Sequence, residues 1–198
     1  MKWIVGVDEA GRGPLAGPVS VGVVKVPVDF DWSTISGVGD SKKISEENRE
    51  AIFLRAQELR HHGQLDFAVS MVGPSVIDDK GIMYAINTAM SRCIQRLKLT
   101  PNECDFKLDG SLMAPSQFVQ ETIIKGDDKE LSIGLASILA KVTRDKYMKR
   151  IARHYFQYGF EVHKGYGTKS HRESISRYGK CPIHRVSYCK NIKTLYNK

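Results

Sequence analysis

The first 28 residues constrain the fold most, because they hold two apolar β-forming segments separated by helix-breaking residues. Trp3 to Val7 is a short apolar run that ends at Asp8 and Glu9, and Val19 to Val28 is rich in valine. The interval contains glycines at positions 11, 13 and 17 and prolines at positions 14 and 18. Proline disrupts a helix interior, so this pattern predicts two strands joined by a Gly/Pro loop and paired antiparallel.

The rest of the chain alternates short β-forming runs with helical segments. Ser45 is expected to begin a helix whose buried face includes Ile52, Leu54 and Leu59. The other predicted elements are a strand over 64–72, a helix capped by Ser75, a helix over 82–97, strands over 105–108 and 121–124, a long helix over 131–154 and a short helix capped by Thr168. Strands first, then strands alternating with helices, predict an α/β fold with a mixed sheet flanked by helices. A length of 198 residues suits one domain over 1–198, with a C-terminal helical segment from about residue 155.

Charge points to a polyanionic partner. The formal net charge is +8 and the pI is about 9.3, which favours nucleic acid, although a basic surface alone is equally common in other soluble proteins. The N-terminal apolar run is too short for a signal peptide, and no segment approaches the roughly 20 apolar residues of a membrane span. We therefore expect a monomeric cytoplasmic protein that binds nucleic acid and no membrane.

The four cysteines show no CxxC pair, and a chain of this length needs no disulfides. We expect reduced thiols. Cys181, His184 and Cys189 are spaced unlike any strong zinc motif, so a zinc site there is a minor alternative.

Carboxylates follow three of the predicted strands: Asp8 and Glu9 after the first, Asp109 and Asp127 after the two short later ones. Each alone would be an ordinary turn residue. Several carboxylates brought together are costly unless cations neutralise them, and Mg²⁺ and Mn²⁺ prefer such oxygen ligands. Neighbouring strand residues point to opposite faces, so Asp8 and Glu9 share a site only if regular pairing stops there.

The glycine loop, EAGRGPLAGP at 9–18, superficially resembles a dinucleotide-binding fingerprint. The prolines exclude the helix that such a fingerprint requires, so a nucleotide-cofactor enzyme is disfavoured. Glycines instead allow a backbone to approach a ligand closely, and Arg12 supplies a charge for phosphate. A ribose 2′-hydroxyl both donates and accepts hydrogen bonds, so this loop is suited to read it.

Six motifs together resemble the prokaryotic type 2 ribonucleases H. They are GVDEAGRGPLAGPV at the start, DSKKIS at 40–45, LDG at 108–110, KGD at 125–127, ASILAKVTRD at 136–145 and HKGYGT at 163–168. They occur in the family's order and span most of the chain. The resemblance implies an RNase H-like fold with a mixed five-stranded sheet, flanking helices and a small C-terminal helical part.

The same resemblance implies an endonuclease that cuts the RNA strand of RNA–DNA hybrids and cuts 5′ of single ribonucleotides in duplex DNA. Two Mg²⁺ or Mn²⁺ ions would act in hydrolysis that leaves 3′-hydroxyl and 5′-phosphate ends. By resemblance, Asp8, Glu9, Asp109 and Asp127 are the catalytic metal ligands. Gly11, Arg12 and Gly13 would read the ribonucleotide, and Tyr166 would pack on the adjoining sugar.

Further basic residues are candidates for phosphate contacts, although each alone is more often a solvated surface charge: Lys42, Lys43, Lys125, Lys141, Arg144 and Lys164. For Asp145 we expect a structural salt bridge or a place on the helix surface, and for Asp128 a place outside the metal ligands. Two alternatives remain: a binding module without catalysis, which would lack a carboxylate, and a type 3 ribonuclease H. The latter usually carries an extra N-terminal domain, for which Asp8 lies too near the start of this chain.

Overall fold

The computed structural model describes residues 2–39 and 41–195, so Asp40, the first residue of the DSKKIS motif, lies outside it. A five-stranded sheet has the order β3-β2-β1-β4-β5. Its strands are β1 (Trp3–Ala10), β2 (Val19–Pro27), β3 (Asp66–Val72), β4 (Cys104–Asp109) and β5 (Val119–Ile123). β1 pairs antiparallel with β2 and parallel with β4, which confirms the predicted mixed sheet.

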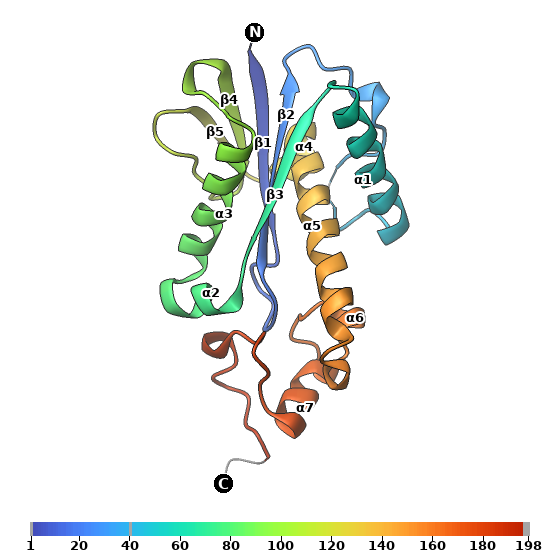
Figure 1. Cartoon of the computed structure of the whole chain (residues 1–198), viewed down its shortest axis with the longest axis vertical. Coiled ribbons are helices and arrows are strands. Elements are labelled where there is room, and N and C mark those ends of the chain that lie inside the picture. Colours follow the sequence, from blue (N-terminus) through green and yellow to red (C-terminus); the bar gives the residue numbers. More distant parts are fainter. Residues whose placement is uncertain (1, 40, 196–198) are drawn as a thin grey trace.

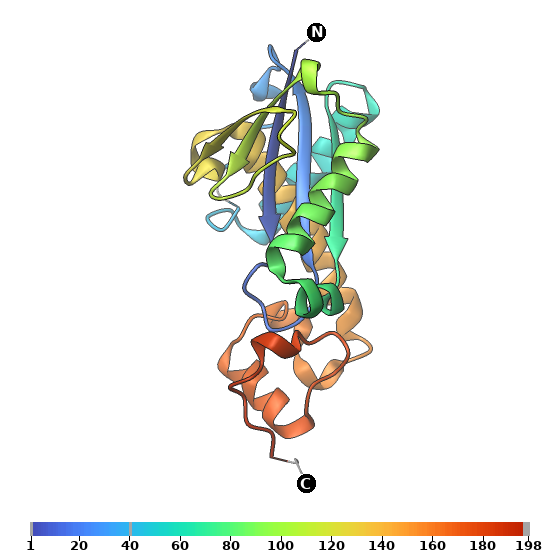
Figure 2. The ribbon, with the colours of Figure 1, turned by 90° about the vertical axis from the view of Figure 1, so that its left-hand side faces the viewer.

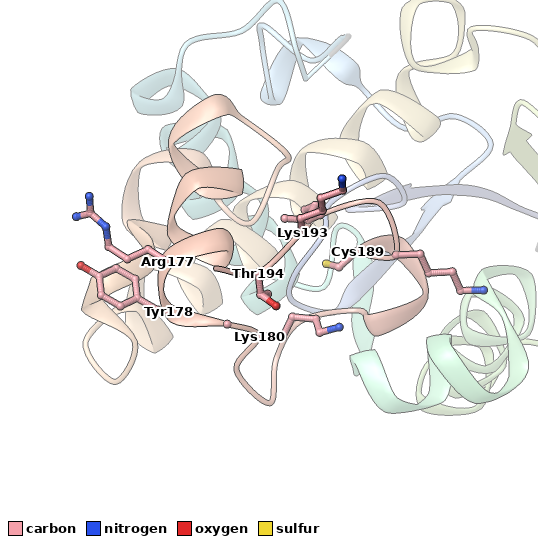
Figure 3. Close-up of a pocket in the computed structure, with 9 residues that line it drawn as sticks. Arg177, Tyr178, Lys180, Cys189, Lys193 and Thr194 are labelled. Atoms are coloured by element: carbon pink, nitrogen blue, oxygen red, sulfur yellow. The ribbon is translucent and has the colours of Figure 1, made fainter. Parts of the chain in front are cut away.

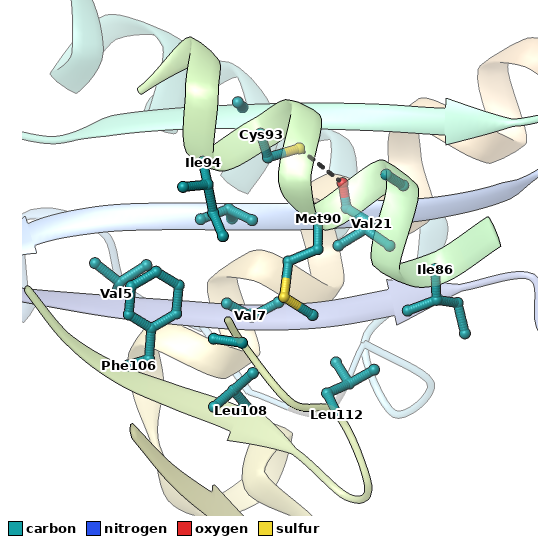
Figure 4. Packing of buried hydrophobic residues seen from close by; sticks show 14 of the residues in the cluster. Val5, Val7, Val21, Ile86, Met90, Cys93, Ile94, Phe106, Leu108 and Leu112 are labelled. Carbon is teal, nitrogen blue, oxygen red and sulfur yellow. Dashed lines mark hydrogen bonds between the residues drawn. The ribbon is translucent and has the colours of Figure 1, made fainter. Parts of the chain in front are cut away.

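Helices cover both faces of this sheet (Figure 1). They are α1 (Glu46–His61), α2 (Pro74–Lys80), α3 (Ile82–Arg96), α4 (Gly126–Lys129), α5 (Leu131–Ala152), α6 (Phe160–His163) and α7 (Lys169–Tyr178). On one face, Met90, Cys93 and Ile94 of α3 pack on valines of β1 and β2 and on Phe106 of β4 (Figure 4). On the other face, α1 and α5 form a second apolar cluster with β2 and β3.

Two strand glycines let α5 lie directly against the sheet. A Cβ atom on Gly6 would lie 2.1 Å from the Ser132 carbonyl carbon, and one on Gly22 would lie 2.3 Å from the Ala136 carbonyl oxygen. Side chains of any size are therefore excluded at both positions. This close approach brings the middle of α5 beside the C-terminal end of β1, where the candidate carboxylates lie.

The C-terminal part forms one end of the molecule, below the β1–β2 loop (Figures 1 and 2). Its own apolar cluster includes Tyr158, Phe160 and Ile175, and it also takes in Ala16 of the loop and Met148 of α5. The loop is therefore packed between the sheet and the C-terminal residues. Within the described residues, no helix is long and apolar enough to cross a membrane.

Some local predictions are confirmed and others are wrong. The Ser45 and Thr168 side chains accept the expected capping hydrogen bonds. Ser75 does not cap α2, because Gly73 is its N-cap and Pro74 its first residue. Leu54 is 56% exposed, because α1 packs through Ile52 and Leu59 on a neighbouring stripe.

Candidate active site

Asp8 and Glu9 lie inside β1, so regular pairing does not stop before them as the sequence suggested. Asp8 is opposite Gly22 and Glu9 opposite Val21 of β2, and this ladder continues to Ala10. On the other side of β1, pairing with β4 ends at Val7 opposite Leu108. The two carboxylates therefore lie just beyond the last paired residues of β1 and β4.

The Asp8 side chain is buried, at 5% exposure. Its pKa is raised well above the usual value by burial first, and further by the nearby Glu9 and Asp109 carboxylates. A hydrogen bond from Ser137 of α5 and one from the Glu9 amide, at 2.7 Å, partly oppose this rise. A buried carboxylate that accepts only a few hydrogen bonds is stabilised by a nearby cation, so this position favours cation binding.

The Glu9 pKa is also raised, by burial first and by Asp109, and it is lowered in part by Arg12. The Arg12 guanidinium lies 3.5 Å from the Glu9 carboxylate. Asp109 thus raises the pKa of both Asp8 and Glu9, which places three carboxylates in one electrostatic cluster.

Asp109 is fixed by the segment that carries Asp127. The Gly126 amide donates a 2.7 Å hydrogen bond to the Asp109 carboxylate, and Asp127 follows directly in α4. Lys125 adopts a left-handed conformation, φ 55°, that turns the chain from β5 into this helix. The turn therefore brings Asp127 to the same edge of the sheet as Asp109.

The donor chemistry of this cluster suits Mg²⁺ or Mn²⁺. All four side chains are carboxylates, the ligands that these hard cations prefer. For Asp8 and Glu9, burial and the neighbouring negative charges raise the pKa and so oppose ionisation. Among the described residues, however, no three His, Cys, Asp or Glu side chains are arranged as a ready-made metal site. The carboxylates would have to close around an ion, and the repulsion between them is the term that the ion would relieve.

The glycine loop has two different glycine positions. Gly11 has φ +86°, and a Cβ atom there would lie 2.0 Å from Nε of Arg144. A Cβ atom on Gly13 would meet nothing within 4 Å. Gly11 is therefore required by the protein interior, whereas Gly13 faces open space from which a ligand could approach.

Arg144 is not available for phosphate contacts, contrary to the prediction. It is buried at 1% exposure, and its guanidinium donates hydrogen bonds to the carbonyls of Pro18, at 2.9 Å, and Ala16, at 3.1 Å. It also lies 5.6 Å from the Tyr166 ring centre. Tyr166 itself is 42% exposed, so part of its ring can contact a ligand.

The predicted phosphate-binding lysines have different environments. Lys42 and Lys125 are exposed, and Lys43 forms an ion pair with Asp128 at 2.6 Å. Lys164 donates a 2.5 Å hydrogen bond to the Glu161 carbonyl. These four remain candidates for phosphate contacts.

Lys141 forms a 2.5 Å ion pair with Asp145, which confirms the salt bridge expected for Asp145. Asp145 is buried at 6% exposure, so the alternative place on the helix surface is wrong. Sequence reasoning missed Ser137, although the ASILAKVTRD motif that contains it was recognised as significant.

A separate hollow of about 500 Å³ lies in the C-terminal part (Figure 3). Arg177, Lys180, Lys190 and Lys193 line it, and none of the described residues that line it is acidic. None of the predicted site residues belongs to it. The four cysteines are free. Cys181 contacts His184, whereas Cys189 contacts the Leu15 carbonyl, so among the described residues these three side chains are not grouped as a metal site.

Comparison with known proteins gives a consistent result. A family model described as Ribonuclease HII matches residues 5–191. The curated "Ribonuclease HII" of Caldicellulosiruptor bescii is 46% identical over 98% of this chain and 90% of its own length. The crystal structure of ribonuclease H2 from Pyrococcus horikoshii is similar with a TM-score of 0.73 and 25% identity, over 96% of this chain and 97% of that one. Bst-RNase HIII in complex with Mn²⁺ shares the fold, with a TM-score of 0.64 and 18% identity over 88% of this chain and 61% of that one.

Proposed function

The chain belongs to the ribonuclease HII family, whose members are ribonuclease H endonucleases, and from this premise we propose its substrates and its chemistry. We propose that it cuts the RNA strand of RNA–DNA hybrids and also cuts 5′ of single ribonucleotides embedded in duplex DNA. The products would carry 3′-hydroxyl and 5′-phosphate ends.

The observation that carries this proposal is the clustering of carboxylates beside an exposed backbone loop. Asp8 and Glu9 lie near the C-terminal end of the sheet's central strand, and the Asp109 carboxylate of the parallel neighbour raises the pKa of both. The glycine loop begins after Ala10, and its residues Arg12 and Gly13 are exposed. A phosphodiester held at the carboxylates would therefore place its sugar within reach of this loop.

Asp8, Glu9, Asp109 and Asp127 would hold the metal ions. Two divalent ions about 4 Å apart can activate a water molecule and stabilise the leaving oxygen of a phosphodiester. The Mn²⁺ complex of Bst-RNase HIII supports this cofactor class. Ser137 and the Glu9 amide would keep the Asp8 carboxylate oriented toward the cluster.

The loop and Tyr166 would supply recognition. Backbone groups of Gly11, Arg12 and Gly13 would bind the 2′-hydroxyl, and the exposed part of the Tyr166 ring would pack against the next sugar. Lysines 42, 43, 125 and 164 would contact phosphates along the strand, and Lys141 would reach one if it left Asp145. The basic hollow of the C-terminal part adds to the positive charge that favours a polyanion.

The test is to incubate the protein with a duplex of DNA that contains one ribonucleotide, with Mg²⁺ or Mn²⁺, and to map the cut. We expect a single cut on the 5′ side of the ribonucleotide. The same duplex with a deoxyribonucleotide at that position should stay intact, and an RNA–DNA hybrid should be cut at several positions. Cleavage of the hybrid alone would refute the proposal for embedded ribonucleotides while leaving the ribonuclease H assignment in place.

Asp8→Asn provides the matched control, because it removes one charged ligand and nearly preserves shape. It should bind the duplex but not cut it.

A further inference from the structure

The backbone of the glycine loop is held by an arginine that lies more than 160 residues away in the sequence. Arg185 is fully buried, and its guanidinium donates hydrogen bonds to the carbonyls of Gly11 at 2.6 Å, Arg12 at 2.9 Å and Gly17 at 3.0 Å. A planar guanidinium presents its donors in a fixed fork, which suits it to hold several carbonyls at once. The conformation of the loop is therefore set from the C-terminal segment.

The same C-terminal segment also forms backbone hydrogen bonds with the loop. The Arg185 amide donates to the Leu15 carbonyl at 2.8 Å, and the Gly17 amide donates to the Ile183 carbonyl at 2.8 Å. Residues 183–185 thus cover the inner side of the loop, at the junction that Figures 1 and 2 show below β1.

This arrangement separates the acceptors of the loop from its donors. The carbonyls of Gly11 and Arg12 point inward to Arg185. The amides of Arg12 and Gly13, at exposed positions, make no hydrogen bond among the described residues. Two backbone N–H groups are therefore free to bind a ligand oxygen, while the carbonyls behind them are already satisfied.

His184, the residue before Arg185, is linked to Tyr166 through His171. The His171 Nδ1 donates to the Tyr166 carbonyl at 2.8 Å, because a carbonyl can only accept. In neutral His171 the Nε2 atom is then an acceptor, and it lies 3.0 Å from Nε2 of His184. The proton between them belongs to His184, whose Nδ1 accepts from the Cys181 amide at 2.9 Å.

Each hydrogen bond in this chain has one consistent direction, from Cys181 through His184 and His171 to Tyr166. Burial lowers the pKa of both histidines to about 4, which keeps the chain neutral and intact at neutral pH. Adjacent residues, His184 and Arg185, therefore fix Tyr166 on one side and the glycine loop on the other.

We propose that Arg185 is a positioning residue for ribonucleotide recognition: it holds the Gly11 and Arg12 carbonyls inward so that the Arg12 and Gly13 amides face the sugar. With His184, it makes residues 181–185 part of the structure that supports substrate recognition, although no atom of Arg185 would touch the substrate. This inference rests on the proposed function, because it assigns the means by which that site selects a 2′-hydroxyl.

The test compares Arg185→Met and Arg185→Lys with the wild-type protein on two duplexes that differ in one 2′-hydroxyl. The first measurement is kcat/KM for the single-ribonucleotide duplex. The second is the inhibition constant of the all-DNA duplex as a competitor. We expect kcat/KM to fall on the order of 100-fold in Arg185→Met, because recognition groups displaced by about 1 Å cost that much. The inhibition constant should change by less than about 2-fold, because phosphate contacts dominate DNA binding.

Arg185→Lys keeps the charge but cannot hold three carbonyls, so its kcat/KM should lie between those of wild type and Arg185→Met. Arg153→Met is the matched control, since Arg153 is exposed on the end of α5 and its removal subtracts the same charge. It should leave both measurements near wild type. Circular dichroism and melting temperature identify any variant that is unfolded, in which case Arg185→Lys alone decides.

A purely structural role would lower kcat/KM only in proportion to the folded fraction of the protein, so kcat/KM per folded molecule, and with it the preference for the ribonucleotide duplex, would stay unchanged. Unchanged preference in a folded Arg185 variant would therefore overturn the inference. If the wild-type protein cuts only hybrids, the proposal for embedded ribonucleotides fails, and the same comparison is then made with hybrid and DNA duplexes.

Discussion

Alanine at Gly11 should lower the stability of the protein, whereas alanine at Gly13 should lower cleavage and leave stability nearly unchanged. Gly11→Ala forces a residue with a side chain to adopt φ +86°, which costs about 1–2 kcal/mol. Its Cβ atom would lie 2.0 Å from the Arg144 Nε, so the guanidinium must leave the Pro18 and Ala16 carbonyls. Each hydrogen bond from a charged donor is worth about 1.5–3 kcal/mol, so the total loss is roughly 4 kcal/mol at the low end.

A loss of this size is a large share of the roughly 5–15 kcal/mol by which domains are stable. At about 2–4 °C per kcal/mol for a chain of this length, the melting temperature should fall by about 10 °C. Gly13→Ala meets nothing within 4 Å, so its stability should stay within about 0.5 kcal/mol of wild type. Its methyl group would nevertheless project beside the free amides and should reduce cleavage at a single ribonucleotide on the order of 100-fold.

The assay is calorimetric melting of both variants, followed by cleavage of the single-ribonucleotide duplex at a temperature where both are folded. If Gly11→Ala melts within a degree or two of wild type, the argument from Arg144 is wrong. If Gly13→Ala cuts as fast as wild type, the sugar does not approach the loop from this side. The sequence alone suggested that the Gly11 backbone lies close to the sugar, whereas the structure directs a methyl group at this position into the protein.

Three other predictions concern charge. Asp8→Asn should abolish cleavage but raise the melting temperature of the metal-free protein. The folded protein raises the pKa of Asp8, so ionisation of this carboxylate destabilises the fold once the pH exceeds the pKa of Asp8 in the unfolded chain. Added Mn²⁺ should stabilise the wild-type protein and not the variant, and equal stabilisation of both would exclude Asp8 as a ligand. Burial lowers the pKa values of His171 and His184 to about 4, so the contribution of these neutral histidines to folding stability is present above pH 6.5 and is lost as pH falls toward 4, by at most about 3 kcal/mol each. The melting temperature measured across this pH range checks the prediction, and His171→Asn should make it depend less on pH. Binding of the duplex should weaken with salt at a log–log slope near −4 if about five basic residues contact phosphates, and a flat response would mean that the positive charge is incidental.

The sequence predicts the sheet well because its strands have simple patterns. The apolar segment at 3–7 and the valine-rich segment at 19–28 consist of β-forming residues, and the intervening glycines and prolines exclude a helix. The parallel pairing of β1 with β4, which brings Asp8 and Asp109 together, has no signal in these local patterns. The register could not be foreseen, so Asp8 and Glu9 were expected beyond the strand rather than within it.

The long helix α5 shows where pattern reading fails. It is buried on nearly all sides along its first half, so apolar periodicity does not define one inner face. Arg144 and Asp145 then read as surface charges, because such residues are rarely fully buried. Only the packed structure shows that Arg144 fills the space left by Gly11 and that Asp145 is closed off with Lys141.

The C-terminal segment was the least informative part of the sequence and proves to be tied most closely to the loop. Its contacts join residues 165 or more positions apart, and no local pattern signals them. Carboxylates can be arranged by the sheet alone, since β1 and β4 are adjacent strands. In our proposal a buried donor on the far side of the loop orients the loop amides, and Arg185 donates the hydrogen bonds found there. The proposed metal ligands and the proposed sugar-reading loop are thus held by different parts of the fold, so we expect that a substitution at Arg185 removes discrimination between ribose and deoxyribose while the carboxylate cluster stays intact.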